Sequence, residues 1–147
     1  MDMIIKNGTI VNASGTVKAD VGIKDGKVVC ISDSISDEEC DNIIDASGKL
    51  VLPGAIDAHT HLAMPFGGTV SSDDYFAGTR AAACGGTTTV FDFALQDFGE
   101  KMTDTVKRRD ALCAPVAAVD YSFHVAVKDV ENCLIDGIGE CVEIVVP

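Results

Sequence analysis

From residue 55 onward, short apolar runs alternate with segments of helical pattern, and this alternation constrains the fold more than any other feature of the sequence. The apolar runs predict four strands, over residues 55–59, 87–93, 116–125 and 142–146. The segments between them predict helices over residues 72–84, 100–113 and, with a weaker pattern, 130–137. Strands that alternate with helices are typical of a parallel sheet with helical crossovers. We therefore expect an α/β fold for residues 54–147.

The first of these helices carries signals at both ends. Ser71 is expected to cap its N-terminus, because the hydroxyl can accept a backbone N–H near Asp74, whose carboxylate suits the positive end of a helix. Gly85 and Gly86 are expected to end it.

Residues 1–53 carry a different pattern. Two dipeptides, Asn7-Gly8 and Asp25-Gly26, lie between apolar runs. Each can adopt the two positive φ angles of a type I′ turn, so each predicts a β-hairpin. Two further apolar runs, 43–45 and 49–52, predict two more strands. We expect this part of the chain to be an antiparallel, all-β portion that precedes the α/β part.

The α/β part is short for a closed barrel. Its predicted strands and helices occupy about 93 residues, whereas a (β/α)₈ barrel typically needs about 250. The apolar run 142–146 is followed only by Pro147. The pattern predicts the first four βα units of a larger enzyme. A complete small α/β protein is the alternative that the sequence leaves open.

Charge and hydrophobicity argue against two classes of partner. The 147 residues contain 11 Lys and Arg against 23 Asp and Glu, a formal net charge of −12. So acidic a chain is a poor partner for nucleic acid or for an anionic membrane. The sequence has no run of 18 apolar residues and no signal-peptide pattern. We therefore expect a cytoplasmic protein whose six cysteines are reduced.

The residues that indicate chemistry stand at the end of the first strand of the α/β part. His59, Thr60 and His61 form an H-x-H tripeptide. Residues two apart on a strand share a face, so the two imidazoles are expected to converge on one cation. Asp57, one step earlier, is expected to orient an imidazole or to approach the metal itself. An isolated H-x-H also occurs by coincidence, so the metal hypothesis depends on the surrounding sequence.

That surrounding sequence resembles the P-G-x-I-D-x-H-x-H signature of the amidohydrolase superfamily, whose members join a β-sandwich to a metal-dependent (β/α)₈ barrel. The matching residues run from Pro53 to His61, and residues 4–11 are similar to the first strands of the sandwich. Three further segments are similar to the dihydropyrimidinase and D-hydantoinase branch, namely residues 64–74, 82–88 and 120–124.

The resemblance implies a hydrolase that opens cyclic amides, either dihydropyrimidines or 5-substituted hydantoins, to N-carbamoyl amino acids. In that family the H-x-H histidines hold one of two divalent metals, usually zinc, and His59 and His61 match those positions. The bridging carboxylated lysine, two further histidines and the catalytic aspartate are expected beyond Pro147, and Lys128 is not assigned the bridge. Members of the family tend to form tetramers, so a homo-oligomer is expected of the full-length protein.

The loop after the H-x-H motif is expected to contact the substrate. It places Phe66 beside Gly67 and Gly68, and we expect Phe66 to meet the exocyclic substituent of the ring. Four other polar residues near the predicted strand ends are expected to be structural: Asp92, Gln96, Asp97 and His124.

One alternative to an enzyme remains open. The same family includes dihydropyrimidinase-related proteins that kept the fold, lost the metal ligands and act as oligomeric interaction proteins. The intact pair His59 and His61 favours the enzyme.

Overall fold

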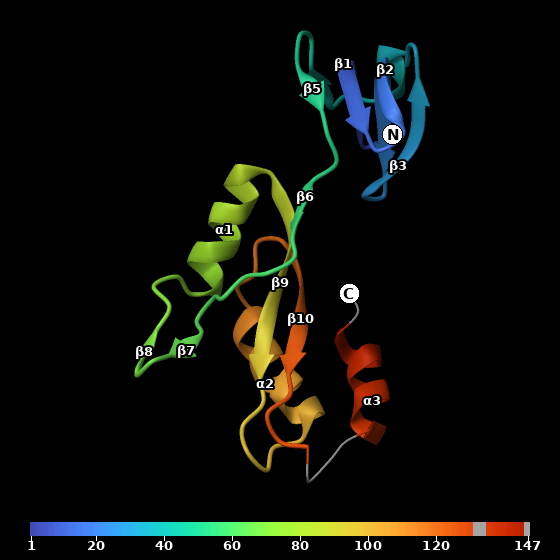
Figure 1. The fold of residues 1–147 in the computed structure, drawn as a ribbon. Helices are drawn as coiled ribbons and strands as arrows, with labels where there is room; N and C mark the ends of the chain where they lie inside the picture. The colour runs from blue at the N-terminus through green and yellow to red at the C-terminus, as the bar shows by residue number, and fades with distance from the viewer. Residues whose placement is uncertain (131–134, 146–147) are drawn as a thin grey trace. The chain divides into compact units, whose positions relative to one another are not determined.

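The computed structural model describes residues 1–130 and 135–145 of the chain (Figure 1). It contains two compact units, Met1–Pro53 and Gly54–Pro147. The first unit is built around a β-sheet, and the second combines parallel strands with helices. The chain is therefore a mixed α/β protein, as the sequence predicts.

The first unit is a sheet in the order β3-β2-β1-β4, with β5 also paired to β1. Its elements are β1 (Met3–Asn12), β2 (Gly15–Lys24), β3 (Lys27–Ser32), the 3-10 helix η1 (Asp37–Glu39), β4 (Ile43–Asp45) and β5 (Leu50–Val51). The first three strands are antiparallel, but β4 and β5 both run parallel to β1. The expected antiparallel arrangement is therefore wrong for these two strands. They share one edge of β1, and an apolar strand pattern carries no information about the direction of pairing.

The Asn7-Gly8 dipeptide is a bulge inside β1, so the first predicted hairpin is wrong. β1 continues through the dipeptide, and its register with β2 shifts between Ile5 and Gly8. Asn7 has a φ of 62°, and its N–H donates to Oδ1 of Asp20 at 2.9 Å. The positive φ that suggests a turn therefore serves a bulge, in which one extra residue leaves the ladder and finds another acceptor.

The second predicted hairpin is confirmed. β2 and β3 are joined by Asp25 and Gly26, with Lys24 paired to Lys27. Asp25 has a φ of 51° and Gly26 a φ of 70°, as a type I′ turn requires.

The second unit is built around three parallel strands in the order β10-β9-β6 (Figure 1). Its elements are β6 (Ala55–Asp57), β7 (Pro65–Phe66), β8 (Thr69–Val70), α1 (Tyr75–Gly85), β9 (Thr87–Leu95), α2 (Met102–Cys113), β10 (Asp120–Ala126) and α3 (Ile135–Val145). The short strands β7 and β8 form an antiparallel hairpin. The helices α1 and α2 pack against β9, and α3 packs against α2.

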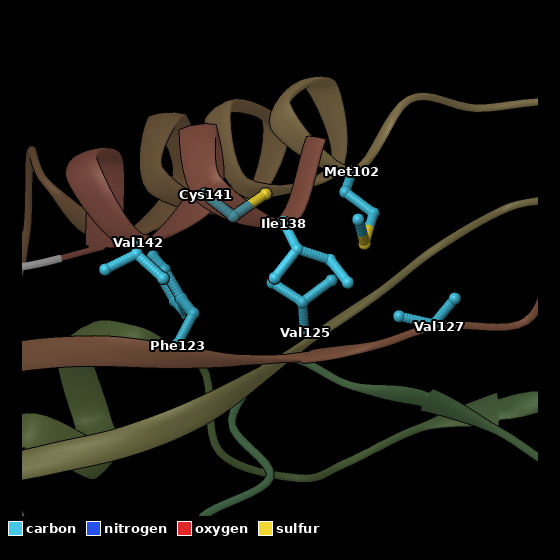
Figure 2. Close-up of a pocket in the computed structure, with 7 residues that line it drawn as sticks. All are labelled: Met102, Phe123, Val125, Val127, Ile138, Cys141 and Val142. Carbon is cyan, nitrogen blue, oxygen red and sulfur yellow. The ribbon is translucent and has the colours of Figure 1, made fainter. Parts of the chain in front are cut away.

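The predicted fourth strand is wrong, because residues 142–145 belong to α3. Ile138, Cys141 and Val142 recur at helical spacing and line one pocket with Phe123 and Val125 of β10, toward which Ile138 and Val142 point (Figure 2). A short apolar run fits a buried helix as well as a strand, and periodicity alone does not separate the two. Residues 131–134 of the predicted third helix, and residues 146–147, lie outside the described part. The described residues of this unit thus contain three βα units, where the sequence predicts four.

The start of α1 also differs from the prediction. Its N-cap is Asp74, whose carboxylate accepts the N–H of Ala77 at 2.8 Å. The hydroxyl of Ser71 instead accepts the N–H of Met64 at 2.8 Å. Asp and Ser are comparable N-caps, so local chemistry alone does not choose between them. At the other end Gly86, with a φ of 86°, ends the helix as predicted.

Alternation along β9 separates the two faces of the parallel sheet. Val90, Asp92 and Ala94 are buried on the face that the helices cover. Phe91 and Phe93 face the opposite side. This opposite side carries the polar residues that end β6, and it positions the site described next.

Two general properties follow from the described residues. Within residues 1–130 and 135–145, no helix has both the length and the apolarity needed to cross a membrane. Five cysteines are free thiols: Cys30, Cys40, Cys84, Cys113 and Cys141. Cys133 lies outside the described residues.

Candidate metal centre

The two motif histidines meet just beyond the end of β6. The strand ends at Asp57, two residues earlier than predicted, so His59 and His61 lie in the loop that follows. Their Nε2 atoms are 3.0 Å apart, and the rings meet edge to face with centroids 4.8 Å apart. Because a zinc–imidazole bond is about 2.0–2.1 Å long, one ion can lie within bonding distance of both nitrogens.

The second nitrogen of His61 has a partner of its own. Nδ1 of His61 lies 3.0 Å from Sδ of Met64. A thioether sulfur accepts hydrogen bonds only weakly, and it cannot donate one. The contact therefore suits an imidazole with its proton on Nδ1, and Nε2 is directed at the other ring.

The main chain of the motif is held by hydrogen bonds. Oδ1 of Asp57 accepts the N–H of His59 at 3.2 Å. Thr60 donates both its N–H and its hydroxyl to the carbonyl oxygen of Phe91, at 2.9 and 3.1 Å. Asp57 thus fixes the backbone of His59, and its proposed contact with an imidazole or a metal stays a prediction.

The two histidines pack against a row of aromatic side chains on the same face of the sheet. The ring of Phe93 contacts both, with centroids 4.7 Å from His59 and 5.1 Å from His61. His124 in turn contacts Phe91 and Phe93, and its Nε2–H donates to the carbonyl oxygen of Ala58 at 2.9 Å. His124 is therefore hydrogen-bonded, as expected, but its acceptor lies inside the motif segment.

Sequence analysis missed Phe93 as part of the site. The signal was present, because residues 91, 93 and 95 share one face of a strand that pairs with β6. The register between β6 and β9 decides which face of β9 lies toward the histidines. In this register Asp57 lies opposite Val90.

A pocket of about 600 Å³ adjoins the histidine pair. Its lining is mostly apolar and consists of His61, Met64, Phe66, Thr69, Val70, Ser71 and Leu95. Phe66, on the β7–β8 hairpin, is 80% exposed and shares this pocket with His61. A hollow of this size can hold a small ring with a substituent.

The donor set fits a shared metal only in part. Two neutral imidazoles are suitable ligands for zinc, but a catalytic zinc site has three protein ligands. In the part of the chain that the structure describes, no group of three or more His, Cys, Asp or Glu side chains could hold a metal ion. The pair therefore supplies two of the ligands that such a site would need.

The other polar residues singled out in the sequence have structural contacts. Asp92 is fully buried and pairs with Arg109 at 2.8 Å. The side chain of Gln96 is also fully buried, and its Oε1 accepts the N–H of Lys128 at 3.0 Å. Asp97 is exposed and forms ion pairs with Arg108 and Lys128, at 3.3 and 3.7 Å.

Comparison with known proteins gives matches along most of the chain. A model described as "Amidohydrolase family" matches residues 50–133, and one described as "Urease alpha-subunit, N-terminal domain" matches residues 1–52. D-hydantoinase of Ralstonia pickettii is 45% identical over 136 residues, which are 92% of this chain and 29% of that protein. Dihydropyrimidinase 2 of Caenorhabditis briggsae is 41% identical over 127 residues, 86% of this chain and 24% of that protein.

A solved structure agrees with these matches. The crystal structure of dihydropyrimidinase from Brevibacillus agri superposes on 97% of this chain with a TM-score of 0.86 at 45% identity, and the match covers 30% of that protein. The chain thus spans less than a third of the length of these relatives.

Proposed function

We propose, since this chain belongs to the amidohydrolase family, that the protein containing it hydrolyses cyclic amides. The substrates are dihydropyrimidines or 5-substituted hydantoins, and the products are N-carbamoyl amino acids. The names of the relatives, D-hydantoinase and dihydropyrimidinase, support this substrate class. Because the chain spans under a third of those relatives, the activity is proposed for a protein of their full length, called the full-length protein below.

One observation carries the proposal. The Nε2 atoms of His59 and His61 lie 3.0 Å apart at the carboxyl end of β6, beside a pocket that His61 shares with Phe66. In barrel enzymes this end of the strands is where catalytic groups gather. We propose that β6, β9 and β10 are the first strands of such a barrel, and that residues 1–53 belong to its β-sandwich.

His59 and His61 would hold a divalent metal, zinc by preference, in a site with two metals. When bound, such a metal polarises an amide carbonyl and lowers the pKa of a coordinated water. The chain's own residues orient the two imidazoles, through the contact of His61 with Met64 and the contacts of both rings with Phe93. The mostly apolar lining of the neighbouring pocket suits an apolar ring substituent, and Phe66 is placed to contact it. The remaining ligands would come from outside this chain, and the full-length protein is proposed to be a homo-oligomer.

The proposal is tested by His59→Ala and His61→Ala in the full-length protein. Each variant is expected to lose bound divalent metal and to lose turnover of dihydrouracil and hydantoin, because the ligand set has little redundancy. Metal is measured by elemental analysis after dialysis, and ring opening by loss of substrate absorbance. Ser72→Ala, in the exposed segment before α1, is the control and should keep both properties.

The two readouts separate the enzyme from the alternative. Full metal occupancy with near-normal turnover in either histidine variant would overturn the metal assignment. A wild-type protein that binds no metal and opens neither ring would instead favour a non-enzymatic member of the family.

A further inference from the structure

A buried ion pair lies on the helix side of the sheet, behind the histidine motif. Nη2 of Arg109, on α2, is 2.8 Å from Oδ2 of Asp92, on β9. Their side chains are 5% and 0% exposed. The hydroxyl of Tyr75, on α1, donates to the same carboxylate oxygen at 2.5 Å. The three consecutive elements α1, β9 and α2 thus meet at one carboxylate.

This ion pair also forms hydrogen bonds with the main chain directly after His61. Arg109 donates from Nη2 to the carbonyl oxygen of Leu62 at 2.7 Å, and from Nη1 to that of Ala63 at 3.1 Å. Oδ1 of Asp92 accepts the N–H of Leu62 at 3.2 Å. The two charged groups therefore hold both sides of one peptide segment, and Ala63 adopts a φ of 45° within it.

Stability alone is a poor explanation for such a pair. Two charges taken out of water pay a desolvation penalty that their attraction often fails to exceed, so an apolar pair of the same volume would serve a core as well. What an apolar pair could not do is donate to two carbonyls and accept an amide of an irregular segment. A planar guanidinium does this with a fixed fork of donors.

We propose that Arg109 and Asp92 are positioning residues that fix the segment after His61, and thereby hold its imidazole at bonding separation from His59. The inference rests on the proposed function, since it assigns the separation to metal binding. Groups that orient metal ligands from behind typically change metal affinity or activity by about 10- to 100-fold when they are replaced.

Two conservative variants of the full-length protein test this proposal. Arg109→Lys keeps the charge but loses the fork, and Asp92→Asn keeps the shape but loses the charge. Both are expected to speed amide hydrogen exchange in peptides covering residues 58–64 of the metal-free protein. Both are also expected to weaken Co²⁺ binding, followed by its visible absorption, by about 10- to 100-fold.

Met102→Ala is the matched control. Met102 lies on the same helix as Arg109 and is 2% exposed. It lines the pocket between α2, β10 and α3 that Figure 2 shows, away from the histidine motif. It should lower the melting temperature comparably and leave exchange at 58–64 and Co²⁺ affinity unchanged. Tyr75→Phe removes only the hydroxyl that donates to Asp92. It should change hydrogen exchange and Co²⁺ affinity in the same direction as the charge variants, but by less. It therefore tests the proposal if the charge variants do not fold.

The outcomes distinguish this inference from the proposed function. If Arg109→Lys, Asp92→Asn and Tyr75→Phe change exchange and Co²⁺ affinity no more than Met102→Ala does, the pair is structural and the inference fails. If the wild-type protein binds no Co²⁺, the proposed function fails, and exchange at 58–64 still decides whether the pair fixes this segment.

Discussion

At the scale of single residues, the geometry of the histidine pair depends on neighbours that are not themselves ligands. His61 stacks on Phe93, His59 contacts the same ring at a tilt, and His124 donates a hydrogen bond to the carbonyl of Ala58 next to them. An exposed imidazole has several rotamers, and each contact removes some of them before any metal binds. These contacts therefore reduce the side-chain entropy that the imidazoles would otherwise lose when a metal binds.

His124→Phe separates the two contributions of that side chain. Phenylalanine keeps the ring contact with Phe91 and Phe93 but cannot donate to Ala58. We expect the full-length variant to bind divalent metal about 10-fold more weakly, with a similar loss of kcat/KM. His124→Ala, which loses both contributions, should bind metal more weakly still. Metal titration of the two variants checks the order, and equal affinity in wild type and His124→Phe would contradict it.

Phe66→Ala tests the pocket beside the metal centre. The side chain shares a pocket with His61 and is largely exposed, so its removal leaves the core intact. We expect kcat/KM for a bulky 5-substituted hydantoin to fall by about 10-fold relative to that for unsubstituted hydantoin, because even one methylene of apolar contact in a pocket is worth roughly 1–3 kcal/mol, and this contact is partly exposed. Metal content should not change. An equal loss for both substrates would show that Phe66 serves packing alone.

The sequence predicts the candidate ligand pair but not the residues that support it, for a physical reason. The H-x-H motif is local, so its two rings are close wherever the segment goes. Phe93, His124 and Arg109 reach the same segment from three other elements, and their contacts depend on register and on helix placement. Alternation places Phe93 and His124 on given faces of their strands, but it does not say which residue of the neighbouring strand lies opposite.

At the scale of elements, the predictions that failed rested on sequence patterns that are compatible with more than one local structure. Asn7-Gly8 suits a turn and also a bulge, and β1 uses it as a bulge because Asp20 supplies the extra acceptor. The run 142–146 suits a strand and also a helix face, and α3 uses residues 138, 141 and 142 against β10. Asp25-Gly26, a signal of the same kind as Asn7-Gly8, does form a turn, and Gly86 ends α1 as predicted.

The start of α2 gives a pH-dependent prediction. Glu100, just before the helix, accepts two hydrogen bonds from Arg108, at 3.0 and 2.9 Å, and one from the hydroxyl of Thr105 at 2.7 Å. The hydrogen bonds from Arg108 are the main cause that lowers the pKa of Glu100 from 4.5 to about 2. A carboxyl whose pKa is lower in the folded state stabilises the fold above its ordinary pKa, and this contribution is lost as pH falls from about 4.5 toward 2.

Glu100→Gln should therefore destabilise the protein at pH 7 and progressively less as the pH falls. We expect a loss of about 1 kcal/mol in unfolding free energy at pH 7, a value reduced for the exposure of Arg108 to solvent. The difference should shrink between pH 4.5 and 3. Thermal unfolding of both proteins at pH 7, 4.5 and 3 measures it, and a difference that stays constant over this range would assign the effect to something other than the charge of Glu100.

At the scale of the whole molecule, the chain divides between Pro53 and Gly54, where the sequence pattern changes. The second unit presents its helices on one face of the sheet and the histidine motif on the other. Among the described residues the parallel sheet has β6 and β10 as its two edges. Each edge carries backbone groups that can pair with a further strand, and unprotected edges of this kind promote association with other chains.

The last prediction concerns residues 1–147 expressed alone. Two imidazoles do not complete a catalytic zinc site, and within the described ranges no third ligand joins them. Exposed apolar side chains such as Ile56 and Phe98 add to the unpaired edges. We therefore expect the isolated chain to aggregate readily despite its net charge of −12, and to show no hydrolase activity. The measurement is ring opening of dihydrouracil and hydantoin with added zinc, beside the full-length protein at equal concentration, with solubility followed by light scattering. Turnover by the purified chain at about one hundredth of the full-length rate or more would mean that residues within it supply the missing ligands, and the two-histidine description of the site would be wrong.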